Sequence, residues 1–448
     1  MKRSSWRYLW TSQDIRRKLL ITILLLSIYR LAAHVPVPGV DRAALTNLMQ
    51  SGGAGGTLVG LLDLLSGGTV SNFSVLAMGV YPYITAQIIL QLLVPIIPSL
   101  QKRMEEDPRE GQKWMEKWTY ILAVPMAALQ AIGQINIFNS LAGTPIITEF
   151  AFIPGSIVPS LAIVLSMTAG TMFAIWLGEL ISEFGIRNQG LSLIIFAGIV
   201  ARIPANFAGI LADETYGWWL FILTILITVL TIFAIVFVQQ GRRNVPVMYP
   251  GRRVGNRMSM PVKGTLPLMV NMAGMIPLIF AQSLLTFPAI LGGFFANSKI
   301  EFVRNVAVFL QRQFGGTSDF YWIMYFVMVV AFTFFYTNVL FTQQNYGENL
   351  KRVGAQIPGV SRGAATQRYL NRVLSRITLP GALFLGLVAV MPWLISLIVP
   401  QFGSTQSSSF FLISSAGLLI VVGVVRDTFF NIQAELKLHG YDDALLIR

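Results

Sequence analysis

Residues 74–91 read SVLAMGVYPYITAQIILQ, a run of 18 residues without a charged side chain. As one helix this run would be about 27 Å long, close to the thickness of the hydrocarbon core of a membrane. Pro82 and the glycine before it would weaken an exposed soluble helix, whereas a helix buried in a membrane protein tolerates both. Val80, Ile84 and Ile88 recur every four residues and so share one aliphatic face. The stretch therefore predicts a membrane-spanning helix that packs against protein.

The composition of the whole chain indicates the same class of protein. Of its 448 residues, 54% are hydrophobic and 12% are charged, which is far more apolar than a soluble globular protein. Cysteine is absent and the two histidines are His34 and His439, so disulfides and thiolate or histidine metal sites are not expected. We interpret the net charge of +13 as a signal of membrane orientation rather than of nucleic-acid binding.

Apolar runs long enough to span a bilayer recur along the chain. The first, residues 19–33, follows a basic N-terminus, and we expect it to remain as span 1 rather than to be cleaved as a signal peptide. The others cover residues 64–101, 118–148, 151–178, 190–201, 215–241, 264–298, 320–347 and 377–425. Because the last run is long enough for two spans, the sequence predicts ten transmembrane helices.

The distribution of lysine and arginine predicts how these spans are oriented. With the N-terminus inside, the cytoplasmic segments 1–18, 101–117, 182–189, 239–263, 343–376 and 426–448 hold 6, 5, 1, 6, 6 and 3 of these residues, which is 27, against 5 outside. This asymmetry supports ten spans and predicts a membrane protein with both termini in the cytoplasm. The predicted parts are a cytoplasmic N-terminus (1–18), an N-terminal half (19–212), a C-terminal half (213–430) and a cytoplasmic tail (431–448).

Three motifs resemble the SecY family, the central channel subunit of the bacterial Sec protein translocase. They are the run at 74–91, GTLVGLLDLLSGG at 56–68 and NMAGMIP at 271–277, and the likeness covers essentially the whole chain. It implies an all-α integral membrane protein with ten transmembrane helices in two inverted five-helix halves around a central pore. It also implies a protein-conducting channel that passes unfolded secretory polypeptides across the bilayer and releases membrane segments sideways into it.

The resemblance also implies a pore constriction. Branched aliphatic side chains around a narrow point exclude water and ions because nothing there replaces their hydration. By composition alone these residues would be ordinary packing residues, since Ile, Val and Leu dominate every span. The loop at 185–192, which leads into span 5 and contains Leu191, is one residue longer here than in the SecY family. The residues that match the constriction are Val80, Ile84, Leu191, Ile195, Ile279 and Ile420.

Two further elements of the channel are implied by the family. Residues 57–68 resemble a short re-entrant plug helix, and the run is too short to cross a membrane. An interfacial helix would have much the same composition. The resemblance also places a lateral gate between spans 2 and 7, at Thr85 and Asn271. The apolar face of the plug would consist of Leu58, Leu61, Leu62 and Leu65.

Two basic loops that are expected in the cytoplasm cover residues 239–263 and 343–376. Membrane orientation alone would explain their charge, but two such loops on one face would also make a docking surface. In the family these loops receive the ribosome or a SecA-type ATPase motor, which would supply the energy because the chain has no P-loop motif. SecE-like and SecG-like small membrane subunits are the other implied partners, and a signal-bearing polypeptide is the substrate. In the second loop this chain reads PGVSRG at residues 358–363, where the family reads Pro-Gly-Ile-Arg-Pro-Gly. The arginine of this chain therefore stands one position later than the arginine of the family. The expected docking residues are Arg242, Arg243, Arg252, Arg253 and Arg362.

No catalytic residue, cofactor or metal is expected. GVSRG at 359–363 formally matches a nucleophile elbow, but it lies in a basic loop. A secondary transporter of a small solute is the alternative function, because Pro and Gly interrupt spans 2 and 7, yet it would need polar ligands near the midplane. Arg30, Glu179 and Asp427 lie near span ends, where they can reach the interface. An intramembrane hydrolase is disfavoured by the lack of cysteine and the scarcity of histidine.

Overall fold

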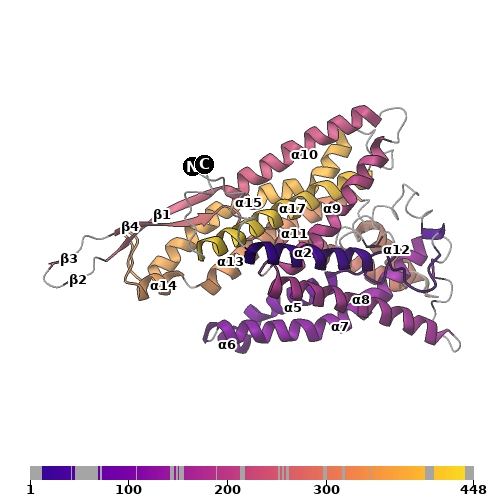
Figure 1. Ribbon diagram of the computed structural model, residues 1–448, viewed down its shortest axis with the longest axis horizontal. Helices are drawn as coiled ribbons and strands as arrows, with labels where there is room; N and C mark the ends of the chain where they lie inside the picture. Colours follow the sequence, from indigo (N-terminus) through magenta and orange to yellow (C-terminus); the bar gives the residue numbers. More distant parts are fainter. Residues whose placement is uncertain are drawn as a thin grey trace.

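The computed structural model is mainly helical. Most of the long helices run roughly along the long axis of the molecule, a β-hairpin projects from one end, and α12 lies toward the other end (Figure 1). The residues that the structure describes are 13–41, 43–45, 69–70, 73–106, 108–141, 146–147, 150, 156–187, 189–211, 217–250, 253–254, 257–258, 262–295, 300–314, 318–344, 346–398 and 408–438.

The elements follow the order of the predicted spans. The N-terminal half contains α2 (Gln13–Ala32), α5 (Tyr81–Ile96), α6 (Pro98–Glu106), α7 (Pro108–Leu141), α8 (Ile157–Phe184) and α9 (Gly190–Leu211). The C-terminal half contains α10 (Gly217–Gln240), α11 (Ile276–Phe295), α12 (Glu301–Phe314), α13 (Asp319–Gln344), α14 (Tyr346–Arg352), α15 (Ala364–Ile398) and α17 (Ser408–Leu438).

Length and composition make this a multi-pass membrane protein. Among the described residues, α7, α8, α10, α11, α13 and α15 are each long and apolar enough to cross a membrane. The bent pair of α5 and α6, whose axes differ by 95°, makes a seventh span if it is counted as one, and α9 holds a shorter apolar helix. Since α2 and α17 occupy the first and last predicted positions, the helices are consistent with ten spans, and that count stays a prediction.

The helix predicted over 74–91 begins later than expected. Ser74 forms an isolated antiparallel bridge with Pro36, residues 75–80 form turns, and α5 starts at Tyr81. Gly79 has a φ of 52°, a backbone conformation that favours glycine. Pro82 consequently lies in the first turn of α5, where its missing N–H removes no helical hydrogen bond. The glycine and the proline, which would weaken one continuous helix, mark where the helix begins.

The first of the two basic loops forms a β-hairpin, which the local sequence pattern does not predict. Strand β1 (Arg242–Tyr249) pairs antiparallel with β4 (Val262–Met269), and β2 (Arg253–Val254) pairs with β3 (Arg257–Met258) nearer the tip. Val245 and Val247 are buried and alternate with exposed residues, as expected for a strand with one covered face. They pack with residues of α13 and α15, among them Phe341, Leu370 and Leu374. The hairpin base is therefore fixed to the C-terminal half.

Candidate functional site

The six residues predicted to form the pore constriction, called the ring residues below, come together in one hydrophobic cluster. Val80, Ile195, Ile279 and Ile420 are buried in it, and Ile84 and Leu191 pack against it. Val80 precedes α5, Ile195 lies on α9, and the two C-terminal members lie on α11 and α17. Most of the cluster belongs to the N-terminal half. The ring residues therefore lie where the two halves meet.

Close packing of α8 against α9 fixes one side of this cluster. A Cβ on Gly190 would lie 1.7 Å from the carbonyl oxygen of Gly178, so only glycine permits this approach of the two backbones. Leu191 then lies against Gly178, because a Cβ there would be 2.7 Å from Leu191 Cδ2. Ile195 follows one turn later on the same face of α9.

Sequence comparison with the family missed several members of the cluster. Ile199 and Val424 are buried in it, and Met275 and Val421 pack against it. Helical spacing could have found two of them, since Ile199 follows Ile195 by four residues and Val424 follows Ile420 by four. Met275 lies just before α11, in a turn that periodicity does not describe.

A second contact joins the halves where α5 meets α11; it is called the gate seam below. Ile88 of α5 clusters with Phe280 of α11 and Tyr336 of α13, and Ile84 and Ile276 pack against this cluster. The rings of Phe280 and Tyr336 are edge to face, with centroids 5.7 Å apart. Ile84 thus belongs to both contacts between the halves.

The gate seam carries polar groups as well as apolar ones. Tyr81 Oη donates a 3.4 Å hydrogen bond to the backbone carbonyl of Ser283 on α11. Thr85 Oγ1 donates to the Pro82 carbonyl at 2.9 Å and accepts from Gln130 Nε2 of α7 at 3.1 Å. The Gln130 Oε1 and Ser283 Oγ atoms are buried without a hydrogen-bond partner in the described part of the chain. The contact between α5 and α11 therefore includes two polar atoms that the described part of the protein does not satisfy.

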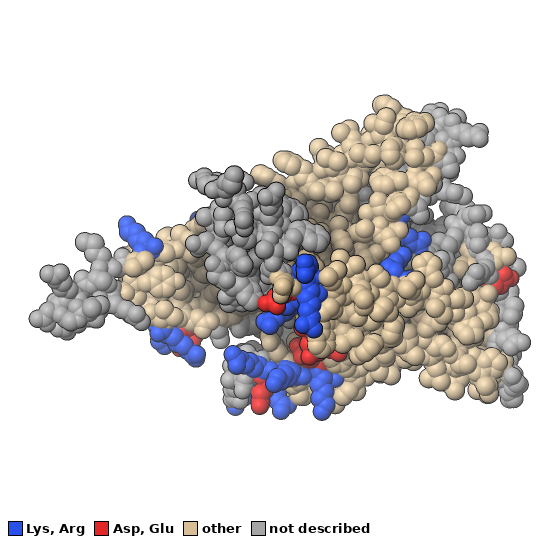
Figure 2. Space-filling model, in the orientation of Figure 1, with Lys and Arg blue, Asp and Glu red and all other residues tan. Residues whose placement is uncertain are grey.

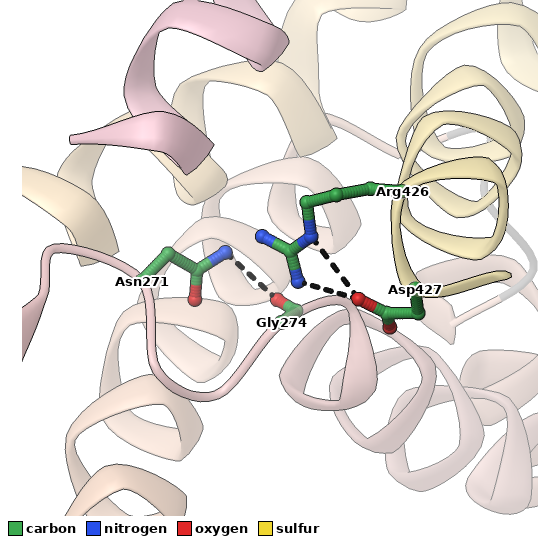
Figure 3. A network of polar contacts seen from close by, with 4 residues as sticks. All are labelled: Asn271, Gly274, Arg426 and Asp427. Carbon is green, nitrogen blue, oxygen red and sulfur yellow. Dashed lines mark hydrogen bonds and ion pairs between the residues drawn. The ribbon is translucent and has the colours of Figure 1, made fainter. Parts of the chain in front are cut away.

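The two predicted gate residues, Thr85 and Asn271, form hydrogen bonds with other residues rather than with each other. Asn271 is buried in the turn before α11, and its Nδ2 donates to the Gly274 carbonyl at 3.0 Å. The Arg426 guanidinium on α17 points toward this turn and forms an ion pair with Asp427, at 2.9 Å from Nη2 to Oδ1 (Figure 3). Asp427 is partly exposed, as expected for an ionisable residue near a span end. Thr85 and Asn271 thus stabilise different helices of the seam.

The described docking residues lie on the hairpin and beside it. Arg242 and Arg243 begin β1 and are exposed. Backbone hydrogen bonds between Met248 and Gln356, of 2.8 and 2.9 Å, join the hairpin to the second basic loop. Arg362 Nε donates to Gln356 Oε1 at 3.2 Å, so this displaced arginine lies where the two loops meet. Most Lys and Arg side chains visible in Figure 2 lie toward the hairpin end of the molecule.

Several predicted residues are not tested by the structure. The plug residues Leu58, Leu61, Leu62 and Leu65, together with Arg252, lie outside the described residues. Arg253 begins the short strand β2, and its side chain is not described. Within the described residues, no group of three or more histidine, cysteine, aspartate or glutamate side chains could hold a metal ion.

Comparison with known proteins decides the family. The SecY family model matches residues 74–429, well over half of the chain. This chain belongs to the SecY family. Two curated relatives are the protein translocase subunit SecY of Streptomyces griseus and that of Synechococcus elongatus, at 38% and 37% identity. The alignments cover 96% of this SecY-family chain and 97% and 94% of the relatives.

Solved structures support the SecY fold. A structure of a protein conducting channel superposes with a TM-score of 0.62 at 17% identity, covering 96% of this chain and 95% of the other. A second structure, from work on the plug domain of the SecY protein, gives the same TM-score and identity and covers 98% and 100%. The predicted helical channel fold is confirmed; the β-hairpin in the first basic loop was not predicted.

Proposed function

We propose that this SecY-family chain is a gated, passive channel for unfolded polypeptides, which opens across the bilayer and sideways at the gate seam. The observation that carries the proposal is the convergence of the six ring residues, from four separate segments, at the junction of the halves. The name of the relatives, protein translocase subunit, favours polypeptide over a small solute as the cargo.

The chemistry of the ring residues suits this cargo. Aliphatic side chains offer no hydrogen bonds or charges to an ion, so a closed ring excludes ions by leaving their hydration uncompensated. The same side chains form only non-directional contacts with a polypeptide, so any sequence can pass. The energy would come from a partner, a SecA-type motor or a ribosome, and the chain itself would carry no catalytic group.

A cross-linking experiment tests whether polypeptide passes the ring. The chain has no native cysteine, so Ile195→Cys introduces one thiol at the ring. The substrate is a signal-bearing polypeptide with one cysteine and a folded C-terminal domain that stalls it midway. We expect a disulfide with Ile195→Cys only when the motor and ATP are present.

The matched control for this experiment is Leu226→Cys on α10, whose side chain is 63% exposed on the membrane-facing surface. Protease protection of a substrate without the stalling domain shows that both variants still translocate. Equal cross-linking at the two positions, or cross-linking only at Leu226→Cys, would exclude a polypeptide path through the ring. A channel that accumulates a small solute without any partner protein would support a transporter instead.

The basic loops are proposed to dock the motor or the ribosome on the cytoplasmic side of the plasma membrane. Arg242 and Arg243 are exposed at the hairpin base, and Arg362 extends the same surface from the second loop; Arg252 and Arg253 belong to the same hairpin sequence. SecE-like and SecG-like subunits would complete the complex. Residues 57–68, with Leu58, Leu61, Leu62 and Leu65, would form the plug below the ring, and Thr85 and Asn271 would belong to the lateral gate.

Charge reversal tests the docking surface. Replacing Arg242, Arg243, Arg252 and Arg253 with glutamate should weaken binding of the motor or ribosome and reduce the dependence of the Kd on salt, because fewer counterions are exchanged. The binding of labelled partner to the complex in nanodiscs, measured from low to high salt, gives both quantities. The control reverses four exposed basic residues outside the hairpin to glutamate, Arg16 and Arg17 on α2 and Lys113 and Lys117 on α7, and so changes the net charge by the same amount. Equal loss in both variants would indicate a general effect of net charge and contradict docking on the hairpin.

A further inference from the structure

Helix α12 has an exposed apolar face that the channel function does not use. Phe302 is 76% exposed, Phe309 is 59% exposed and Val306 is 42% exposed. Their spacing of four and three residues places them on one side of the helix. Three large apolar side chains on one exposed face need a covering environment.

The other faces of α12 have different surroundings. Ala307 is buried against α11, where a Cβ on Gly292 would lie 2.7 Å from the Ala307 carbonyl oxygen. A Cβ on Gly293 would lie 3.6 Å from Gln311 Nε2, so a second turn of α12 also contacts α11. The remaining side of α12 is exposed and mainly polar; it consists of Glu301, Arg304, Asn305 and Arg312, with the half-exposed Val308 among them. One side of α12 is thus covered by protein, one is mainly polar and one is apolar.

The apolar face of α12 lies beside a helix that has an exposed apolar stripe of its own. Helix α11 is apolar and long enough to span a membrane. Its exposed large apolar residues recur at intervals of three and four along one side and continue to its end next to α12; they are Leu284, Phe287, Leu291 and Phe295. Because α12 follows α11 in the chain and packs near its C-terminal end, a bilayer that covers the exposed stripe of α11 would place Phe302 and Phe309 near its edge.

We propose that α12 is an interfacial helix in the leaflet opposite the β-hairpin. Phe302, Val306 and Phe309 enter the boundary between headgroups and acyl chains, while Arg304 and Arg312 lie among the lipid phosphates. An amphipathic helix with an apolar face and a cationic polar face binds this region of a bilayer. Since Gly292 and Ala307 hold α12 against α11, the lipid contact also fixes the depth of one end of α11, a helix of the gate seam.

Spin labelling tests the environment of each face separately. Single cysteines at Phe302, Val306 and Phe309 on the apolar face, and at Arg304 and Asn305 on the polar face, each receive a nitroxide in the otherwise cysteine-free chain. The labelled full-length complex is reconstituted in vesicles of phosphatidylethanolamine and phosphatidylglycerol. We expect labels at 302, 306 and 309 to be more accessible to oxygen than to a water-soluble nickel chelate, and labels at 304 and 305 to show the reverse. Val306→Cys keeps both phenylalanines, so it tests the face without removing its anchors.

Other outcomes would overturn the proposal. If all five labels are equally accessible to the nickel chelate, α12 lies in water. If labels at 302, 306 and 309 are inaccessible to both reagents and show spin–spin broadening, a second copy of the chain covers the face. Inaccessibility without broadening would assign the face to another subunit. Protease protection of a substrate confirms that each labelled complex is intact, and none of these outcomes depends on whether the ring residues form the pore.

Discussion

The ring residues and the gate seam are both contacts between the two halves of the molecule, but they are chemically different. The ring consists of aliphatic side chains, which form no hydrogen bonds across the junction. At the seam, Tyr81 hydrogen bonds to the Ser283 carbonyl, and Thr85 pairs with Gln130 of its own half. The Ser283 and Gln130 side chains each keep one buried polar atom without a protein partner in the described chain.

The chemical difference between the ring and the seam would allow the junction of the two halves to exclude ions and still open. Aliphatic contacts seal against ions and separate without breaking any directional bond. Unsatisfied polar atoms at the seam destabilise the closed state, because a buried polar group without a partner costs about 1–3 kcal/mol. In the proposed mechanism, opening of the seam would expose these atoms to water or to the backbone of a substrate. The ring would therefore determine how well the channel seals, and the seam would determine how easily it opens.

The largest expected effect is at the ring. Replacing Ile84, Ile195 and Ile279 with serine shortens the apolar side chains and offers hydroxyl groups to water, so the barrier to ions should fail. Single-channel current through the purified complex in planar bilayers should show ion conductance in the closed state. The expected change is from essentially no current to frequent openings.

A matched triple variant separates leakage from loss of stability. Ile222, Leu226 and Leu230 on α10 are all more than half exposed, and serine at these positions adds the same hydroxyl groups away from the ring. If the ring residues only pack helices, their replacement would lower stability by about 2–5 kcal/mol per large-to-small change and add no conductance. A folded ring variant as ion-tight as wild type would disprove the pore assignment.

Smaller effects of opposite sign are expected at the gate seam. Ser283→Ala removes the unsatisfied hydroxyl but keeps the carbonyl that accepts from Tyr81, so it should stabilise the closed state by about 1–3 kcal/mol. Tyr81→Phe removes the hydrogen bond between the halves and should destabilise it by about 1 kcal/mol. A fluorophore pair on α5 and α11 reports the fraction of open seam in each variant. A shift in the same direction for both variants would contradict the division of roles between ring and seam.

The sequence alone determined the class of the protein and the position of most helices. Long uncharged runs can be stable only in a membrane, and the asymmetry of lysine and arginine predicts their orientation, because both properties depend on composition rather than on contacts. The ring residues were predicted only through motifs shared with the family, since Ile195 has the same side chain as any packing isoleucine.

The tertiary structure decided what local patterns cannot. It brought Val80, Ile195, Ile279 and Ile420 into one cluster, although up to 340 residues separate them in the chain. It showed that α5 begins at Tyr81, because the preceding residues Leu76, Ala77 and Met78 form turns that are buried against distant segments. It formed the β-hairpin, whose valines are buried only because α13 and α15 cover them. Each of these features depends on which distant segments meet, and that is a property of the folded chain.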